Sequence, residues 1–268
     1  MNARHWVCGL SLLGFWACVE QPQGHCQVAQ KQGEAHFVVY TPIVPMEGDA
    51  CQEKALTTEK IGFESYQLPG KDKISIAWRT ETLQQHFDLA RESEGWDYNK
   101  SQETSLSLNV QADYSSKPDE ENRCYIFDNS NPDPRSFRLS AKFEAFETLP
   151  KKDKDGNPIP PEPVPAAIYN YEWRNMVVYS MPASPGQLVE GEVTYTLMEG
   201  GETCTGTYSF VALWPAHQCK KDEDCTPSVG GKEGSPINPD FAGSLRCHPA
   251  RFCTVTRPPA ELIRALSK

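Results

Sequence analysis

The ten cysteines of this 268-residue chain are the residues whose chemistry is easiest to define. Cys18 directly follows Ala17 at the end of an apolar run that begins at Val7, shortly after Arg4. The eleven residues from Val7 to Ala17 are too few to span a bilayer, but they suit the apolar region of a secretory signal peptide. We therefore predict that residues 1–17 are a lipoprotein signal peptide, removed by cleavage before Cys18.

The junction Phe15-Trp16-Ala17-Cys18 resembles the lipobox at which bacterial prolipoproteins are cut and acylated. The resemblance implies that Cys18 is the lipidation site, carrying palmitate or a similar fatty acid. Residues 18–25 would then be a polar tether between the membrane and a folded body. Trp16 departs from the pattern, in which a small residue is usual. The alternatives are an ordinary signal peptide cut a few residues later and a buried N-terminal strand.

Eight cysteines remain once Cys8 leaves with the signal peptide and Cys18 is acylated. An even number in an exported chain predicts complete oxidation to four disulfides. In the body the expected pairs are Cys26 with Cys51 and Cys124 with Cys204. In the tail the equal spacings fit either Cys219–Cys247 with Cys225–Cys253 or the nested pairs Cys219–Cys253 and Cys225–Cys247. Four tail thiolates would also suit zinc, but each pair is more widely spaced than zinc knuckles usually are, so we expect no metal.

Two groups of side-chain oxygens resemble fragments of a calcium site. Asp153, Asp155 and Asn157 surround Gly156, and Asp222 and Asp224 lie between two tail cysteines. Calcium prefers six to eight oxygens, and the prolines after Asn157 prevent the helix that would aim a further ligand. We therefore predict a solvated hairpin tip and a charged surface loop.

Catalysis is not indicated by any motif. The chain has no GxSxG, HExxH, P-loop or GxGxxG sequence, and its histidines after residue 17 follow no triad pattern: His25, His36, His86, His217 and His248. A formal charge of -10 and a pI of about 5.2 argue against nucleic-acid binding, because an acidic surface repels phosphate. We therefore expect a protein that is not an enzyme and needs no cofactor.

The elements that must position these residues are predicted to be short strands, because apolar and polar residues alternate with period two. The strand candidates are 35–40, 60–68, 73–78, 105–114, 123–127, 137–143, 168–179, 193–197 and 205–214. Glu199-Gly200-Gly201-Glu202 predicts a hairpin between the last two. One short helix is expected over residues 81–92, with capping-box spacing from Thr82 to Gln85. The fold class is mainly β, an antiparallel β-sandwich that is Ig-like or related.

Two segments interrupt the strand pattern. Residues 150–165 hold six prolines and predict a long loop between two strands. After Trp214-Pro215 the strand pattern ends and four cysteines follow within a short tail. The expected organisation is a signal peptide (1–17), a tether (18–25), a β-sandwich domain (26–215) and a disulfide-stapled appendage (216–268), which ends in a possible helical turn.

Five segments carry a resemblance to a known family: GEVTYTLMEGGETCTGTYSFVALWPAHQC, KKDEDC, GSPINPDFAGSLRCHPARFC, EKIGFESYQLPG and SIAWRTETL. They resemble segments of predicted lipoproteins that occur as multiple paralogues in myxobacteria. The resemblance implies an exported, disulfide-bonded lipoprotein and no reaction. Because Val19 is not the aspartate that retains enterobacterial lipoproteins at the inner membrane, the expected location is the outer membrane of the cell envelope.

We expect a noncatalytic binding or structural role, with an envelope protein or glycan as partner. The alternative is an exported hydrolase or a carbohydrate-binding protein on the same scaffold. A glycan-binding face would need Trp78, Trp96, Trp173 and Trp214 to be exposed and coplanar, and we expect most of them to be buried.

Overall fold

The computed structural model describes residues 25–67, 74–93, 108–181, 185–228 and 234–266. Within them the fold is mainly β and antiparallel, as predicted, and all nine predicted strands are present. These are β1 (His36–Val44), β2 (Thr58–Gln67), β3 (Ile74–Thr80), β4 (Val110–Tyr114), β5 (Arg123–Phe127), β6 (Ser136–Phe143), β11 (Ala167–Ser180), β12 (Pro185–Glu199) and β13 (Glu202–Leu213).

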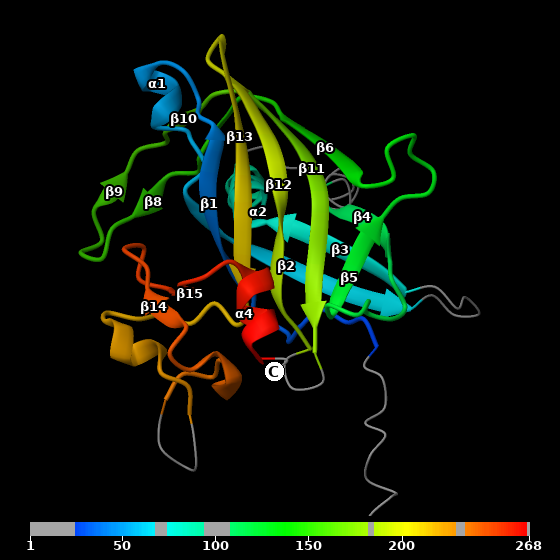
Figure 1. The fold of residues 1–268 in the computed structure, drawn as a ribbon. Coiled ribbons are helices and arrows are strands. Elements are labelled where there is room, and N and C mark those ends of the chain that lie inside the picture. The colour runs from blue at the N-terminus through cyan, green and yellow to red at the C-terminus, as the bar shows by residue number, and fades with distance from the viewer. Residues whose placement is uncertain (1–24, 68–73, 94–107, 182–184, 229–233, 267–268) are drawn as a thin grey trace, which may run out of the picture.

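The nine strands form one sheet in the order β12-β13-β1-β2-β3-β4-β5-β11-β6, and β12 also pairs with β11. The sheet therefore closes on itself and surrounds its core, where the sequence analysis expected two facing sheets (Figure 1). One edge of β11 pairs with β12, and the other pairs first with β6 and then with β5. The change of partner lies at a bulge after Arg174, where Asn175 has a φ of 52°.

Aromatic side chains fill the interior of this sheet. Trp78 and Trp173 are 1% and 0% exposed, and their rings meet edge to face with centroids 6.3 Å apart. Phe210 contacts Trp173 in the same geometry at 5.4 Å. Burial of these two tryptophans, which the sequence analysis predicted, removes them from any exposed glycan-binding face. Trp214 is half-buried, and Trp96 lies outside the described residues.

Helix α2 (Glu81–Arg91) follows β3 directly and packs on the core through Leu83, His86, Phe87 and Ala90. Its bounds agree with the predicted 81–92. The cap residue differs, because the Thr80 hydroxyl accepts the hydrogen bond from the Leu83 backbone N–H at 3.4 Å. Thr80 still has extended backbone, as an N-cap requires, whereas Thr82 is already helical. The short helix α1 (Asp49–Gln52) precedes β2.

The four disulfides join all eight expected cysteines, but the pairing predicted for the body is wrong. Cys26 pairs with Cys124 and Cys51 with Cys204, with Cα separations of 5.7 and 5.3 Å. The nine residues of β1 separate Cys26 from Cys51, and a strand of that length spans roughly 30 Å. The two cysteines therefore lie at opposite ends of the closed sheet, beyond the reach of a disulfide.

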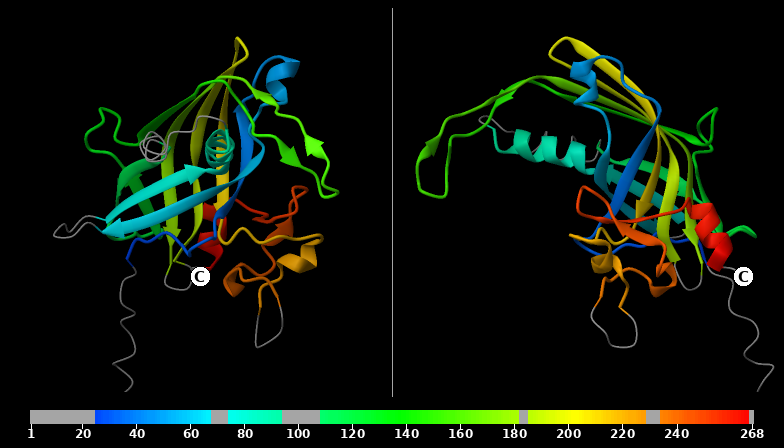
Figure 2. Two further views of the ribbon diagram at one scale, coloured as in Figure 1. Left: turned by 180° about the vertical axis from the view of Figure 1, so that it is seen from behind. Right: turned by 60° about the vertical axis from the view of Figure 1, so that its left-hand side comes forward.

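The proline-rich segment belongs to an arm, residues 144–166, that joins β6 to β11 and projects from the sheet (Figure 2). The arm contains two short ladders, formed by β7 (Phe146–Glu147) with β10 (Pro163–Val164) and by β8 (Lys151–Lys152) with β9 (Pro158–Ile159). Lys151 Nζ lies 2.6 Å from a carboxylate oxygen of Glu92, just beyond the end of α2. The predicted loop is thus partly ordered as a hairpin.

The tail from residue 216 onward, called the appendage, packs on one end of the sheet. Its elements are η1 (Asp222–Cys225), η2 (Pro239–Phe241), β14 (Leu245–Cys247), β15 (Cys253–Val255) and α4 (Pro259–Leu266). Its buried Phe241 and Ile263 share an apolar cluster with Met181 and Leu188, which flank the β11–β12 connection. The N-terminal segment meets the same connection, because the Ala29 N–H donates to the Gly186 carbonyl at 2.9 Å. We call this end of the molecule the anchored end.

The opposite end, called the far end, contains α1 and the β12–β13 turn. Gly200 and Gly201 in that turn have φ values of 61° and 84°, so the predicted hairpin is confirmed. The Cys51–Cys204 disulfide fastens α1 to β13 near this turn. None of the helices among the described residues has the length and apolarity that a membrane span requires.

Candidate functional site

The predicted lipidation site, Cys18, lies outside the described residues, and so does the signal peptide. The oxygen-rich sequence around Gly156 is described, and it forms a hairpin tip as predicted. The two carboxylate oxygens of Asp153 accept hydrogen bonds from the Asn157 backbone N–H at 2.8 Å and from its side-chain amide at 2.9 Å. These oxygens are therefore already engaged in the turn.

The second oxygen pair is also engaged by backbone groups. Asp222 accepts a hydrogen bond from the Cys247 N–H at 2.7 Å. Asp224 accepts from the N–H groups of Lys220 and Lys221 at 2.7 and 3.2 Å. Both carboxylates thus hold the loop that carries them, and their negative charge is turned toward the appendage backbone.

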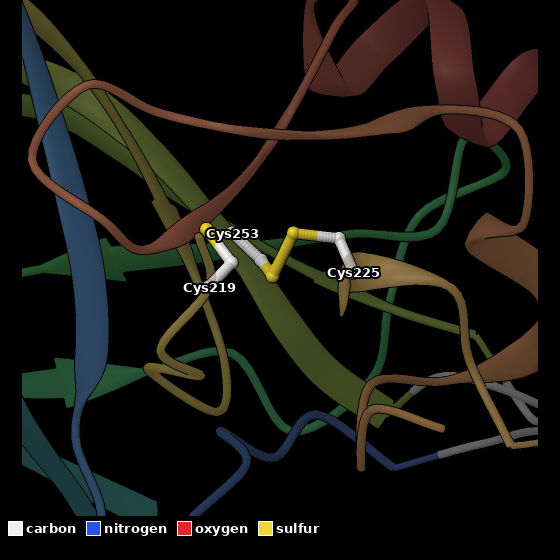
Figure 3. A group of neighbouring side chains, drawn as sticks. All are labelled: Cys219, Cys225 and Cys253. Atoms are coloured by element: carbon white, nitrogen blue, oxygen red, sulfur yellow. A yellow bond between two sulfur atoms is a disulfide. The ribbon is translucent and has the colours of Figure 1, made fainter. Parts of the chain in front are cut away.

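The tail cysteines bring three sulfur atoms close together. The Sγ atoms of Cys219, Cys225 and Cys253 all lie within 4.8 Å of one another, and Figure 3 shows the bond between two of them. The pairs are Cys219–Cys247 and Cys225–Cys253, with Cα separations of 5.8 and 5.6 Å. The first of the two predicted tail arrangements is confirmed. Cysteine binds zinc as a thiolate, and a sulfur atom in a disulfide does not provide one.

Glu59, on β2, is a buried carboxyl group inside the molecule. Tyr40 Oη donates to Glu59 Oε1 at 2.5 Å, and the hydroxyl of Thr82 donates to Oε2 at 3.1 Å. Burial raises the pKa of Glu59 to about 7, although the hydrogen bonds from Tyr40 and Thr82 act in the opposite direction. Only 7% of Glu59 is exposed, so its carboxylate fastens the first turn of α2 to the sheet and does not face solvent.

An open groove of about 510 Å³ lies on the outer face of the sheet, where the appendage meets it. We call it the junction groove. Its floor consists of two rows of side chains that cross three strands, because outward-facing residues on neighbouring strands lie side by side. The row nearer the appendage is Glu190, Val211 and Val39, and the next is Glu192, Ser209 and Thr41.

The alternation of the strands explains this floor. On β13 the inward positions are the buried Tyr208, Phe210 and Ala212, so Ser209 and Val211 must point outward. Close to the anchored end the outward residues Leu188 and Leu213 are apolar, and the appendage covers them. The groove begins where the appendage no longer covers the outward-facing rows, and polar side chains join the two valines there.

The appendage supplies the other wall through Arg246, Thr256, Arg257 and Pro258. Both arginines are exposed, and neither guanidinium has an ion-pair partner among the described residues. Across the groove the Glu190 carboxylate accepts a hydrogen bond from Tyr179 Oη, which fixes its position. The groove therefore combines two cations, two carboxylates, hydroxyls and an apolar strip.

This arrangement suits noncovalent binding of an extended segment that carries both charges and apolar side chains. Sequence reasoning did not find the groove, because its residues come from β1, β12, β13 and the appendage. The outward positions of β13 were available from its alternation. The packing of the appendage over β1 had no local sign in the sequence.

A sequence model of the MlpA family matches residues 34–215, which contain the whole nine-stranded sheet. A Myxococcus xanthus protein named "Putative lipoprotein MlpA" is 26% identical over 232 residues. The aligned region covers 86% of this chain and 81% of that protein. The predicted relation to myxobacterial lipoproteins is confirmed, and the chain belongs to the MlpA family.

Proposed function

We propose that this protein is an exported, lipid-anchored component of the cell envelope that binds another envelope protein without catalysing a reaction. Its anchor is an acyl group on Cys18, its location is the outer membrane, and its binding surface is the junction groove. The observation that carries the binding role is the groove itself, which Arg246 and Arg257 of the appendage line together with Glu190, Glu192 and two valines of the sheet.

A polypeptide segment fits this groove better than a glycan does. Glycan sites usually offer exposed aromatic faces, but Trp78 and Trp173 are buried inside the sheet. The described floor residues are valines, hydroxyls and carboxylates, which match the side chains and backbone of an extended strand. The alternative of an exported hydrolase is not favoured by any specific contact among the described residues, since Glu59 is held by Tyr40 and Thr82 away from solvent.

The anchor is tested by metabolic labelling with a clickable fatty acid. The wild-type chain and a Cys8→Ser variant should both carry the label, whereas Cys18→Ser should carry none. Cys8 is the matched control because it lies in the same predicted signal peptide. An unlabelled wild type, or label that survives Cys18→Ser, contradicts acylation at this residue.

The groove is tested by placing a photo-crosslinking amino acid at Thr41, on the groove floor, and separately at Thr196. Thr196 also faces outward on the sheet but lies outside the groove, next to Thr205. We expect a defined protein adduct from position 41 in intact envelopes, absent from position 196 and reduced by Arg246→Glu. Equal adducts from both positions, or an adduct insensitive to Arg246→Glu, would reject the groove as the binding surface.

A further inference from the structure

We propose that a second surface of the appendage, distinct from the junction groove, binds the anionic headgroups of the membrane on which the protein is anchored. The surface consists of Lys220, Lys221 and Arg251, and we call it the basic patch. This inference rests on the lipid anchor of the proposed function, because the anchor sets which end of the molecule lies near the membrane.

The three cations of the basic patch are brought together by the fold. Lys220 and Lys221 follow Cys219, and Arg251 comes two residues before Cys253. The Cys219 N–H donates to the Arg251 carbonyl at 2.9 Å, so the two segments lie side by side. All three cations line one open hollow of about 640 Å³, together with His248 and the acidic residues Asp222 and Glu223. The tail disulfides hold this arrangement.

The acidic residues beside the basic patch are held differently from its cations. Asp222 and Asp224 accept hydrogen bonds from backbone N–H groups, as described above. Glu223 is exposed, and its carboxylate lies 3.9 Å from Lys221 Nζ. Lys220 and Arg251 are exposed and have no ion-pair partner in that part of the chain. These two cations are therefore available to an external anion.

Charge is distributed unevenly between the appendage and the rest of the chain. Residues 216–268 carry eight basic and six acidic side chains, a formal charge of +2, whereas residues 18–215 carry 17 basic and 30 acidic ones, a charge of -13. At the far end Glu47, Asp49 and Glu53 are exposed. Lys54, the cation nearest them in sequence, lies 3.1 Å from Glu199 and 3.5 Å from Glu202.

The tether keeps the appendage close to the bilayer. His25 is seven residues after Cys18, so even a fully extended tether reaches only about 25 Å. The Ser180 hydroxyl donates to the His25 carbonyl at 3.0 Å, which places the start of the body at the anchored end beside the appendage. The fifteen residues of β12 separate this end from the far end by up to roughly 50 Å.

Electrostatic screening makes this difference in distance decisive. The Debye length at physiological ionic strength is about 8 Å, so only charges close to the membrane surface interact with its headgroups. The exposed carboxylates of the far end, Glu47, Asp49 and Glu53, lie many Debye lengths from the bilayer in this orientation. Basic residues near the surface attract anionic lipids strongly enough to orient the molecule with the appendage toward the bilayer.

The experiment uses the chain from Val19 to Lys268, exported behind a cleavable signal peptide so that it carries no lipid. This chain keeps every described residue. We expect it to sediment with vesicles of phosphatidylcholine containing 40% phosphatidylglycerol, and to stay in solution with phosphatidylcholine alone. Lys220→Gln/Arg251→Gln should weaken the binding by roughly 25-fold, since each basic residue near an anionic surface contributes roughly fivefold.

The matched control is Lys152→Gln/Lys154→Gln, which removes the same charge from exposed positions on the arm. It should leave vesicle binding unchanged, and thermal unfolding should confirm that both variants fold. Equal binding to the two kinds of vesicle, or equal loss in the two double variants, would overturn the proposal. Because this chain is unacylated, its result is independent of the labelling at Cys18, and either proposal can fail alone.

Discussion

Replacement of Gly186 by alanine should destabilise the molecule far more than a methyl group normally does. Gly186 has a φ of 68°, and an added Cβ would lie 2.1 Å from the Gln27 carbonyl oxygen and 2.5 Å from Val28 Cα. Both are backbone atoms, so the overlap is relieved only if the N-terminal segment moves away from the β11–β12 connection. That movement would break the hydrogen bond from Ala29 to Gly186 and expose Val28, which is 3% exposed.

The size of the effect follows from these contacts. A left-handed backbone costs a residue with a Cβ about 1–2 kcal/mol. Loss of one hydrogen bond adds about 1 kcal/mol, and exposure of a buried valine adds about 2 kcal/mol. The free energy of unfolding should therefore fall by about 4–5 kcal/mol.

Gly200→Ala is the matched control, because Gly200 has a φ of 61° and its added Cβ would meet nothing within 4 Å. This variant should lose only the backbone term of about 1–2 kcal/mol. Urea unfolding of the oxidised proteins measures both values, and hydrogen exchange at Ala29 should accelerate only in Gly186→Ala. Equal losses in the two variants would show that the contact with the N-terminal segment is not tight, and would refute the reasoning.

Three further predictions address the disulfides, the buried acid and the metal. Cys51→Ser/Cys204→Ser removes a crosslink between residues that are 153 apart in sequence. On the chain-entropy estimate the free energy of unfolding in urea should fall by about 4–5 kcal/mol. A fall of less than 1 kcal/mol would contradict this prediction. Glu59 has its pKa raised from 4.5 to about 7, so its folded state retains a proton that the unfolded state releases. As the pH rises from 4.5 to about 7, the free energy of unfolding of the wild type should therefore fall by about 3 kcal/mol relative to that of Glu59→Gln. If the unfolding free energies of the two proteins change in parallel with pH, the pKa of Glu59 is not raised. Titration calorimetry should detect no micromolar calcium binding, because the Asp153 oxygens already accept hydrogen bonds within the turn. Micromolar binding that is lost in Asp155→Ala would contradict this prediction.

The strands could be predicted from sequence because their signal is local. Alternation along residues 137–143, for example, reports directly on which face is buried, and β6 shows that pattern. The closure of the sheet could not be predicted in the same way. It depends on β11 pairing with β12 on one edge and with two different strands on the other, a change that occurs at Asn175.

The same distinction separates the correct disulfides from the wrong ones. Cys219 and Cys247 lie in short segments whose equal spacings restrict the geometry, so the sequence permitted few arrangements. Cys26 and Cys51 are close in sequence, but β1 lies between them and carries them apart. Their partners are determined by the tertiary arrangement. The junction groove could not be predicted either, because it depends on the tertiary arrangement: its two walls belong to distant parts of the chain.

The pairing in the body has a consequence for biogenesis. If the chain is exported from its N-terminus, as proposed above, Cys26 and Cys51 reach the oxidising compartment before their partners, which follow 98 and 153 residues later. Oxidation in order of arrival would join Cys26 to Cys51, a bond that the completed sheet cannot contain. Under the proposed export, the native pairing forms when these thiols stay reduced until β5 and β13 have been translocated, or when a disulfide isomerase exchanges the early bond.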